Sequence, residues 1–198
     1  MSSYTIPNVV SRTPRGEKVM DVYSRLLEER IVYLGTPIDD GVANAIIAQV
    51  LHLESESRDL PINLYLNSEG GSVNATFALY DTLRFLRAPI ETTCVGQAFG
   101  PAALLLASGT PGRRTVLPHA RVLLHQPSGQ GRGTIPDLVL AADEVMRVRE
   151  EMEQALSAHT GRDVETLRRD TDRDRILRGP EIVEYGLADS VITERPEA

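Results

Sequence analysis

Hydrophobic positions along the chain alternate between the two-residue spacing of strands and the spacing of amphipathic helices. We expect strands at residues 31–34, 61–66, 90–95, 115–117, 121–124 and 190–193. We expect helices at 19–29, 72–87, 102–107 and 136–158, one more beginning after Asp39 or Asp40, and helical turns near 164–169 and 181–185. Repeated strand-then-helix units predict an α/β architecture, with no sequence repeat and no second domain.

The spacing of apolar residues also predicts which face of each longer helix is buried. The expected core residues are Val42, Ile46, Val50 and Leu53, then Val73, Phe77, Tyr80 and Leu83, and in the long helix Leu138, Ala142, Val145, Met152 and Leu156. The Gly-rich segment before the long helix, residues 128–134, is expected to be mobile.

The amino-terminal residues, 1–18, are polar, contain Pro7 and Pro14, and lack the apolar core of a secretion signal. We interpret them as a flexible arm that precedes a single domain at residues 19–198. An uncharged stretch at residues 92–112 has the length of a membrane span, but glycines and a proline interrupt it. We therefore expect a buried strand, turn and helix there and no membrane association.

Composition narrows the choice of function. The chain has 198 residues, of which 41% are hydrophobic and only 5% aromatic, so small aliphatic side chains must form the core. A net charge of −7 argues against binding to nucleic-acid phosphates or anionic lipid. The single cysteine, Cys94, cannot form an intrachain disulfide or a Cys-based zinc site, so a cytoplasmic location is expected, without metal or cofactor.

Four segments place glycine or a titratable group at the end of an expected strand, where open α/β folds form their sites. They are residues 67–72, 95–101, 124–127 and 170–174. Each also has a simpler interpretation: Gly70-Gly71 as a tight turn, His125 as a hydrogen-bonded buried histidine, and the Asp-Arg run as a solvated face. The residues alone leave these alternatives open.

Together these segments resemble the proteolytic subunit of the ATP-dependent caseinolytic (Clp) protease family, over nearly the whole chain. The matching motifs are residues 11–17, 21–27, 30–35, 67–68, 70–73, 95–98, 125–127, 159–161, 170–174 and 184–187. The resemblance implies a crotonase-like α/β fold in two stacked seven-membered rings, joined by a handle made from the long helix and a Gly-rich strand at residues 128–158. It also implies a Ser-His-Asp peptidase in a closed chamber, which a hexameric AAA+ unfoldase supplies with unfolded polypeptides.

Two residues of the family's triad are matched in this chain, and one is not. The family histidine matches His125, and the family aspartate matches Asp174. The nucleophilic serine matches Gly100, which has no side chain, so no alkoxide can attack a peptide carbonyl. The arginine that matches Arg173 takes part in contacts between rings in the family, so the assembly surfaces are expected to be intact.

The family's oxyanion hole is affected as well. It uses two backbone N–H donors, one from the glycine that matches Gly71 and one from the residue after the serine, which here is Pro101. Proline has no N–H, and loss of one such donor typically lowers turnover by about 10²–10³. Glu69 and Phe99 also depart from the family pattern, the first by adding a carboxylate beside the peptide-binding strand. Drift after the loss of catalysis would explain both.

No other residue is a good replacement for the serine. Ser72 is better explained as a helix N-cap, Cys94 as a small core residue, and Ser108 lies about two helical turns beyond Gly100.

We therefore expect a non-catalytic subunit that forms rings, alone or with an active Clp subunit, and modulates proteolysis. Two alternatives remain: an active Clp serine endopeptidase, and an acyl-CoA enzyme of the crotonase fold, in which paired N–H groups would stabilise a thioester enolate.

Overall fold

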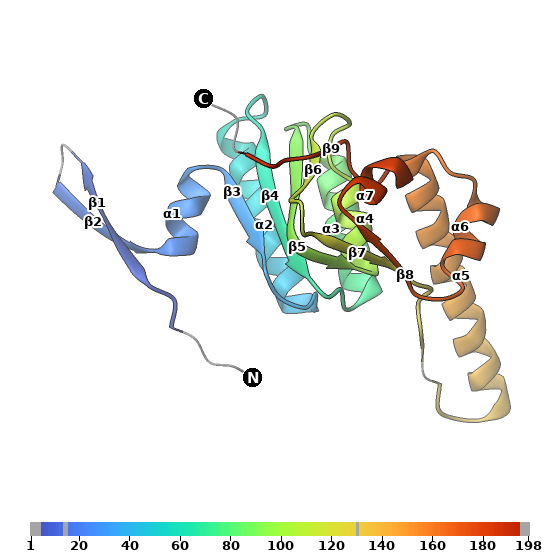
Figure 1. Ribbon diagram of the computed structural model, residues 1–198. Coiled ribbons are helices and arrows are strands. Elements are labelled where there is room, and N and C mark those ends of the chain that lie inside the picture. The colour runs from blue at the N-terminus through green and yellow to red at the C-terminus, as the bar shows by residue number, and fades with distance from the viewer. Residues whose placement is uncertain (1–4, 14–15, 130, 195–198) are drawn as a thin grey trace.

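The protein is described by a computed structural model that covers residues 5–13, 16–129 and 131–194. These residues form a seven-stranded sheet and a separate amino-terminal hairpin, which projects from one end of the molecule (Figure 1). The hairpin strands are β1 (Asn8–Thr13) and β2 (Gly16–Asp21). The sheet strands are β3 (Ile31–Leu34), β4 (Ile62–Ser68), β5 (Ile90–Phe99), β6 (Arg114–Val116), β7 (Arg121–Leu124), β8 (Arg175–Arg178) and β9 (Ser190–Val191).

The main sheet is parallel except at one edge. Strands β3, β4, β5, β6 and β9 are hydrogen-bonded in that order and run in parallel. Strand β7 also pairs with β5 in parallel, and β8 pairs with β7 antiparallel. The carboxyl ends of β4, β5 and β7 therefore meet along one side of the sheet, which is where α/β folds place their sites.

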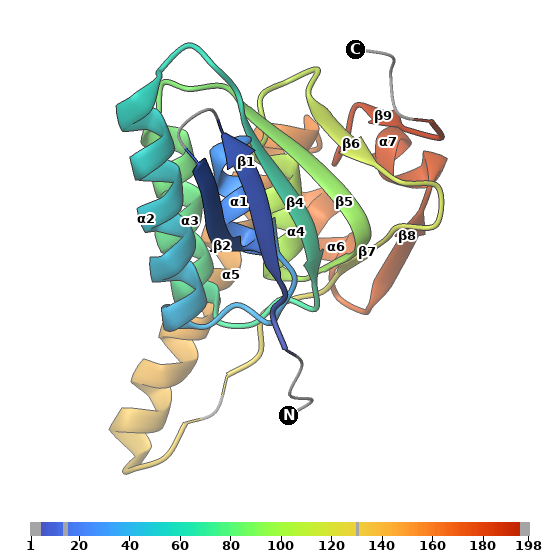
Figure 2. The ribbon, with the colours of Figure 1, turned by 90° about the vertical axis from the view of Figure 1, so that its left-hand side faces the viewer.

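The helices cover the sheet and extend beyond it. Helices α2 and α3 lie along one face of the sheet, as the second view makes plain (Figure 2). The helices are α1 (Val22–Glu28), α2 (Asp40–Glu56), α3 (Val73–Phe85), α4 (Pro101–Ala107), α5 (Ile135–Thr160), α6 (Val164–Asp170) and α7 (Pro180–Tyr185). The expected α/β architecture is confirmed.

The amino-terminal half of the fold follows the sequence pattern closely. Strand β3 has the expected bounds, and the Asp39 side chain caps α2 by accepting a hydrogen bond from the Val42 N–H at 2.7 Å. Every second residue of β4, from Ile62 to Ser68, is buried, as its alternating sequence predicts.

The uncharged stretch forms a strand, a turn and a helix, as expected. It contains most of β5, and all seven residues of α4 are buried. Within the described ranges, no helix is both long enough and apolar enough to cross a bilayer.

The expected buried face of α3 is wrong in part. The buried residues are Ala75, Thr76, Leu79 and Leu83, whereas Phe77 and Tyr80 are only half-buried. Helix α3 packs against both α2 and α4, and its small side chains allow that close approach. The two aromatic side chains instead line a groove of about 530 Å³ beside α5.

The expected buried face of α5 is also wrong in its first half. Only Met152, Glu153 and Leu156 are buried, while Leu138 is 42% exposed. The reason is that the first half of α5 protrudes from the domain and has no sheet to cover (Figures 1 and 2). The Gly-rich strand that the family resemblance implied before this helix is not present in the described residues of 128–134.

Two further differences concern the amino-terminal hairpin and strand β8. In the described part of residues 1–18, where we expected a flexible arm, the chain forms β1 and the first residues of β2. Strand β2 extends to Asp21, which caps α1, so this helix begins at Val22 and not at residue 19. Strand β8 was not expected, because Leu177 is its only buried residue and an isolated apolar position gives no strand pattern.

Arg114 joins four parts of the domain and provides a test of the fold. Its buried guanidinium donates to the carbonyls of Ala107, His159 and Gly186 and forms a two-point ion pair with Asp189. Burial raises the pKa of Asp189, but the hydrogen bonds from Arg114 outweigh burial and hold this pKa below its ordinary value. The pair therefore stabilises the fold above the unfolded-state pKa and loses its effect as the pH falls through the folded-state pKa.

We predict that Asp189→Asn lowers the free energy of unfolding at pH 7 by about 1–3 kcal/mol, because Arg114 loses a charged acceptor. We also predict that the variant loses less stability than the natural chain between about pH 5 and pH 2. Urea unfolding at fixed protein concentration measures both effects, with Asp59→Asn as an exposed control. Equal acid dependence of the variant and the natural chain would contradict the assignment.

Candidate active site

Two strand-to-helix turns form the floor of the candidate site. One follows β4 and contains Gly70 and Gly71, and the other follows β5 and contains Gly100. The turns are in close contact, since a Cβ at Gly70 would lie 2.5 Å from the Phe99 carbonyl oxygen and 3.1 Å from Cδ of Pro101. A side chain at Gly70 would therefore separate the two turns.

Gly100, at the expected nucleophile position, has a backbone conformation that L-residues rarely adopt. Its φ is 50° and its ψ is −116°, and it is the N-cap of α4. A Cβ built on Gly100 would lie 2.7 Å from Nε2 of His125. A side chain at this position thus points at the imidazole, which is the arrangement of a nucleophile elbow. Here the elbow is present without a nucleophile.

Pro101 occupies the position of the second expected oxyanion donor. It is the first residue of α4, is fully buried, and has no N–H. Proline is well suited to the first turn of a helix, since N–H groups there have no partner within the helix. At the other expected donor, Gly71, no hydrogen bond among the described residues uses the N–H. One donor of the expected pair is therefore left.

His125 follows β7 and faces both turns. It lines a small cavity of about 100 Å³, together with Glu69, Gly71 and Pro101. The next residue fixes its place, because the Gln126 N–H donates to the Thr171 carbonyl at 3.0 Å. Glu69 thus brings a carboxylate into the same cavity as the imidazole, and a developing oxyanion there would be repelled.

Asp174 lies near His125 but is not bonded to it. The two residues line one open cleft of about 740 Å³, with Asp172 and Arg173. In the described part of the chain, no hydrogen bond or ion pair joins His125 to Asp174. Arg173 points outward: its side chain is 94% exposed, and its Nε lies 3.8 Å from Oδ2 of Asp172. The structure thus pairs Gly100 with His125 and leaves the expected third member of the triad apart.

Each of the three candidate replacement nucleophiles has a structural role. Ser72 caps α3 by accepting a hydrogen bond from the Ala75 N–H at 3.2 Å, as expected. Ser108 is buried and donates to the Leu105 carbonyl. Cys94 is buried in β5, and burial raises its pKa to about 11. Within the described ranges, no group of three or more His, Cys, Asp and Glu side chains could hold a metal ion.

The fold and the two turns define a class of site: the nucleophile elbow of a serine hydrolase in a parallel α/β sheet, with a histidine beside it and a glycine at the elbow position. Comparison with known proteins then identifies the family. The model of the Clp protease family matches residues 14–195, so the chain belongs to that family.

Curated relatives are similar over their full lengths. The chain is 60% identical over 196 residues to the ATP-dependent Clp protease proteolytic subunit 1 of Nocardia farcinica, covering 98% of this chain and 100% of that one. It is 62% identical over 192 residues to proteolytic subunit 4 of Rhodococcus jostii, covering 97% and 99%. It is 59% identical over 196 residues to proteolytic subunit 2 of Streptomyces avermitilis, covering 98% of both. The family expected from the sequence motifs is confirmed.

We predict that the Cys94 thiol of the folded protein does not react as a nucleophile. At pH 8 a pKa of about 11 leaves about 100-fold less thiolate than an ordinary cysteine has, and burial also blocks access. A thiol-reactive chromophore should therefore label the folded protein at least about 100-fold more slowly than the protein unfolded in guanidinium. Equal labelling rates would reopen the case for Cys94.

Proposed function

We propose that this chain is a non-catalytic or strongly impaired Clp proteolytic subunit that assembles into heptameric rings and tetradecamers, alone or with an active Clp subunit. The observation that carries the proposal is the geometry at Gly100. Its missing side chain would point directly at Nε2 of His125, and the next residue, Pro101, has no N–H. In this proposal His125, Asp174 and Gly71 are the remaining parts of the family's site.

The chemical consequence follows from two separate losses. Without a serine hydroxyl no acyl-enzyme can form by the family's route, because histidine has no nucleophile to activate. Without the second N–H donor, the negative charge of a tetrahedral intermediate would be less well stabilised, a loss of about 10²–10³ in turnover. Restoring either part alone should therefore give little activity.

Assembly is supported by surfaces that a single chain leaves in water. Large apolar side chains are exposed along the protruding first half of α5: Ile135, Leu138, Val139, Leu140 and Met146. Apolar surface of this kind is typical of an interface with another subunit. Arg173, the residue expected to contact the other ring, has an exposed side chain. In this proposal a further subunit of the Clp type covers both.

The proposed role is to alter a shared proteolytic chamber. The relatives are named proteolytic subunits of an ATP-dependent protease, and this chain matches them over almost its whole length. Because the relatives' names call the protease ATP-dependent, we propose an AAA+ unfoldase as a partner and unfolded polypeptides as the cargo. We place the assembly in the cytoplasm.

The two other functions have less support. An active endopeptidase would need a nucleophile, and Ser72, Ser108 and Cys94 are each committed to a structural role. An acyl-CoA enzyme would need a pair of N–H donors around the thioester oxygen, and Pro101 removes one of them.

We predict that a fluorophosphonate probe does not label the purified chain, because Gly100, the residue whose Cβ would face the His125 ring, has no hydroxyl. An active Clp proteolytic subunit at the same concentration is the positive control. Native mass spectrometry of the chain alone, and of the chain co-expressed with that subunit, tests assembly. Labelling at one probe per chain would overturn the inactive site, and single chains in both preparations would overturn the proposed assembly.

We predict that Gly100→Ser with Pro101→Met creates peptidase activity on a short fluorogenic peptide. The Cβ of the serine would lie 2.7 Å from Nε2 of His125, so the imidazole, which is the end of a side chain, must shift to admit it. Gly100→Ser alone should be about 100- to 1,000-fold less active than the double variant, because one oxyanion donor is still missing.

Adding His125→Ala to the double variant is the matched control, and it should abolish the new activity. An inactive double variant that still forms rings would show that the geometry around the site has also changed.

A further inference from the structure

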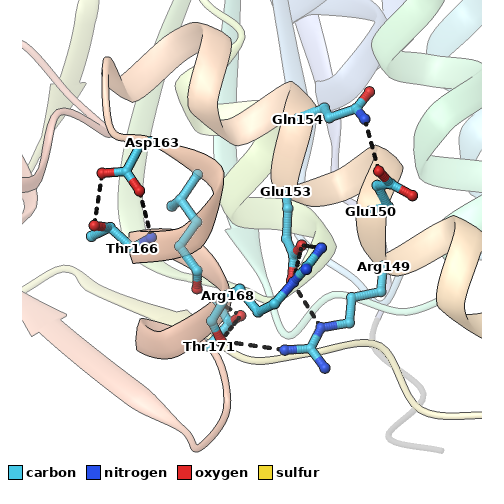
Figure 3. A network of polar contacts seen from close by, with 9 residues as sticks. Arg149, Glu150, Glu153, Gln154, Asp163, Thr166, Arg168 and Thr171 are labelled. Atoms are coloured by element: carbon cyan, nitrogen blue, oxygen red, sulfur yellow. Dashed lines mark hydrogen bonds and ion pairs between the residues drawn. The ribbon is translucent and has the colours of Figure 1, made fainter.

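A buried carboxylate links helix α5 to the segment that carries Asp174. Glu153 lies in α5 with its side chain only 3% exposed, between two arginines (Figure 3). Its Oε1 accepts a hydrogen bond from Nε of Arg149 at 2.8 Å. Its Oε2 accepts two from Arg168, from Nε at 3.0 Å and from Nη2 at 2.8 Å. Arg168 belongs to α6, so these contacts connect α5 with α6.

The same contacts continue toward the cleft. Arg149 also donates to the Arg168 carbonyl, and Thr171, directly after α6, donates to the Leu167 carbonyl. The Thr171 carbonyl accepts a hydrogen bond from the Gln126 N–H, and the Asp172 carbonyl accepts one from the Gln126 side chain at 3.3 Å. Gln126 is next to His125. A continuous series of contacts therefore runs from α5 to the histidine.

The charges make Glu153 the essential member of this group. One carboxylate balances two guanidinium groups, and its hydrogen bonds with Arg168 raise the pKa of that arginine. Without the carboxylate, two positive groups that lie close together would repel each other across the α5–α6 contact. Removing Arg168, whose side chain is 54% exposed, would leave Glu153 paired with Arg149.

We infer that Glu153 is a positioning residue: it fixes the 171–174 loop, and Asp174 with it, relative to His125 and to helix α5. A shift of α5 relative to α6 then moves Asp174 relative to the imidazole. This role does not depend on the loss of the nucleophile, so it holds whether or not the chain cleaves peptides.

The test compares Glu153→Gln with Glu150→Gln in the full-length chain by amide hydrogen exchange. Glu150 is on the same helix, is exposed, and has Gln154 as its hydrogen-bond partner at 3.4 Å among those described; it acts on Arg168 by charge alone, without a hydrogen bond. We expect the Gln126 N–H to exchange about tenfold faster or more in Glu153→Gln, and at the natural rate in Glu150→Gln. Amides of β4 should be unchanged in both variants, because the effect is local.

Two further readouts separate positioning from simple stabilisation. The ring signals of His125 in a two-dimensional spectrum should move in Glu153→Gln and not in Glu150→Gln. If Glu153→Gln does not fold, Arg168→Gln replaces it, and Arg168→Lys should restore part of the Gln126 protection because one charged donor is kept.

The inference is overturned if exchange rises in α5 and α6 while Gln126 and His125 are unchanged. It is also overturned if all amides, including those of β4, exchange faster by the same factor.

Discussion

The close approach of two backbone turns is the constraint on which the rest of the site depends. A Cβ at Gly70 would collide with the Phe99 carbonyl, and a Cβ at Gly71 would collide with the backbone of Ile38. Only glycine allows both contacts, and both glycines have a positive φ. Because β4 and β5 are parallel neighbours, this contact fixes where β5 ends and α4 begins. The direction from Gly100 to His125 follows from it.

The sequence predicted the helices and strands correctly where a local signal and the tertiary environment agree. Strand β3 and helix α2 are examples, since a β-rich run or an Asp cap is sufficient to define them. The buried faces of α3 and α5 were partly wrong, because a hydrophobic stripe shows that a partner exists and does not identify it. Phe77 faces a groove, and Leu138 lies on the part of α5 that leaves the domain.

At the candidate site, the sequence predicted which residues take part but not how they lie relative to one another. The positions of His125 and Gly100 came from motifs shared with a family, and no periodicity could have shown that a Cβ at one would face the ring of the other. Glu153 was missed, although Arg149 and Glu153 have the four-residue spacing of a helical ion pair. Charged residues at such spacing usually lie in solvent, and only the packing of α6 on α5 buries this carboxylate.

The proline after Gly100 also has a thermodynamic meaning. A serine held at a φ of 50° would be strained by about 1–3 kcal/mol, and glycine removes that strain. Proline at the first position of a helix restricts the unfolded chain and typically adds about 0.4–1 kcal/mol of stability. The glycine and the proline at these two positions therefore make the turn easier to fold. In the proposed assembly, a protomer that holds no reactive group under strain would act as a rigid scaffold for its neighbours, so that activity is exchanged for stability.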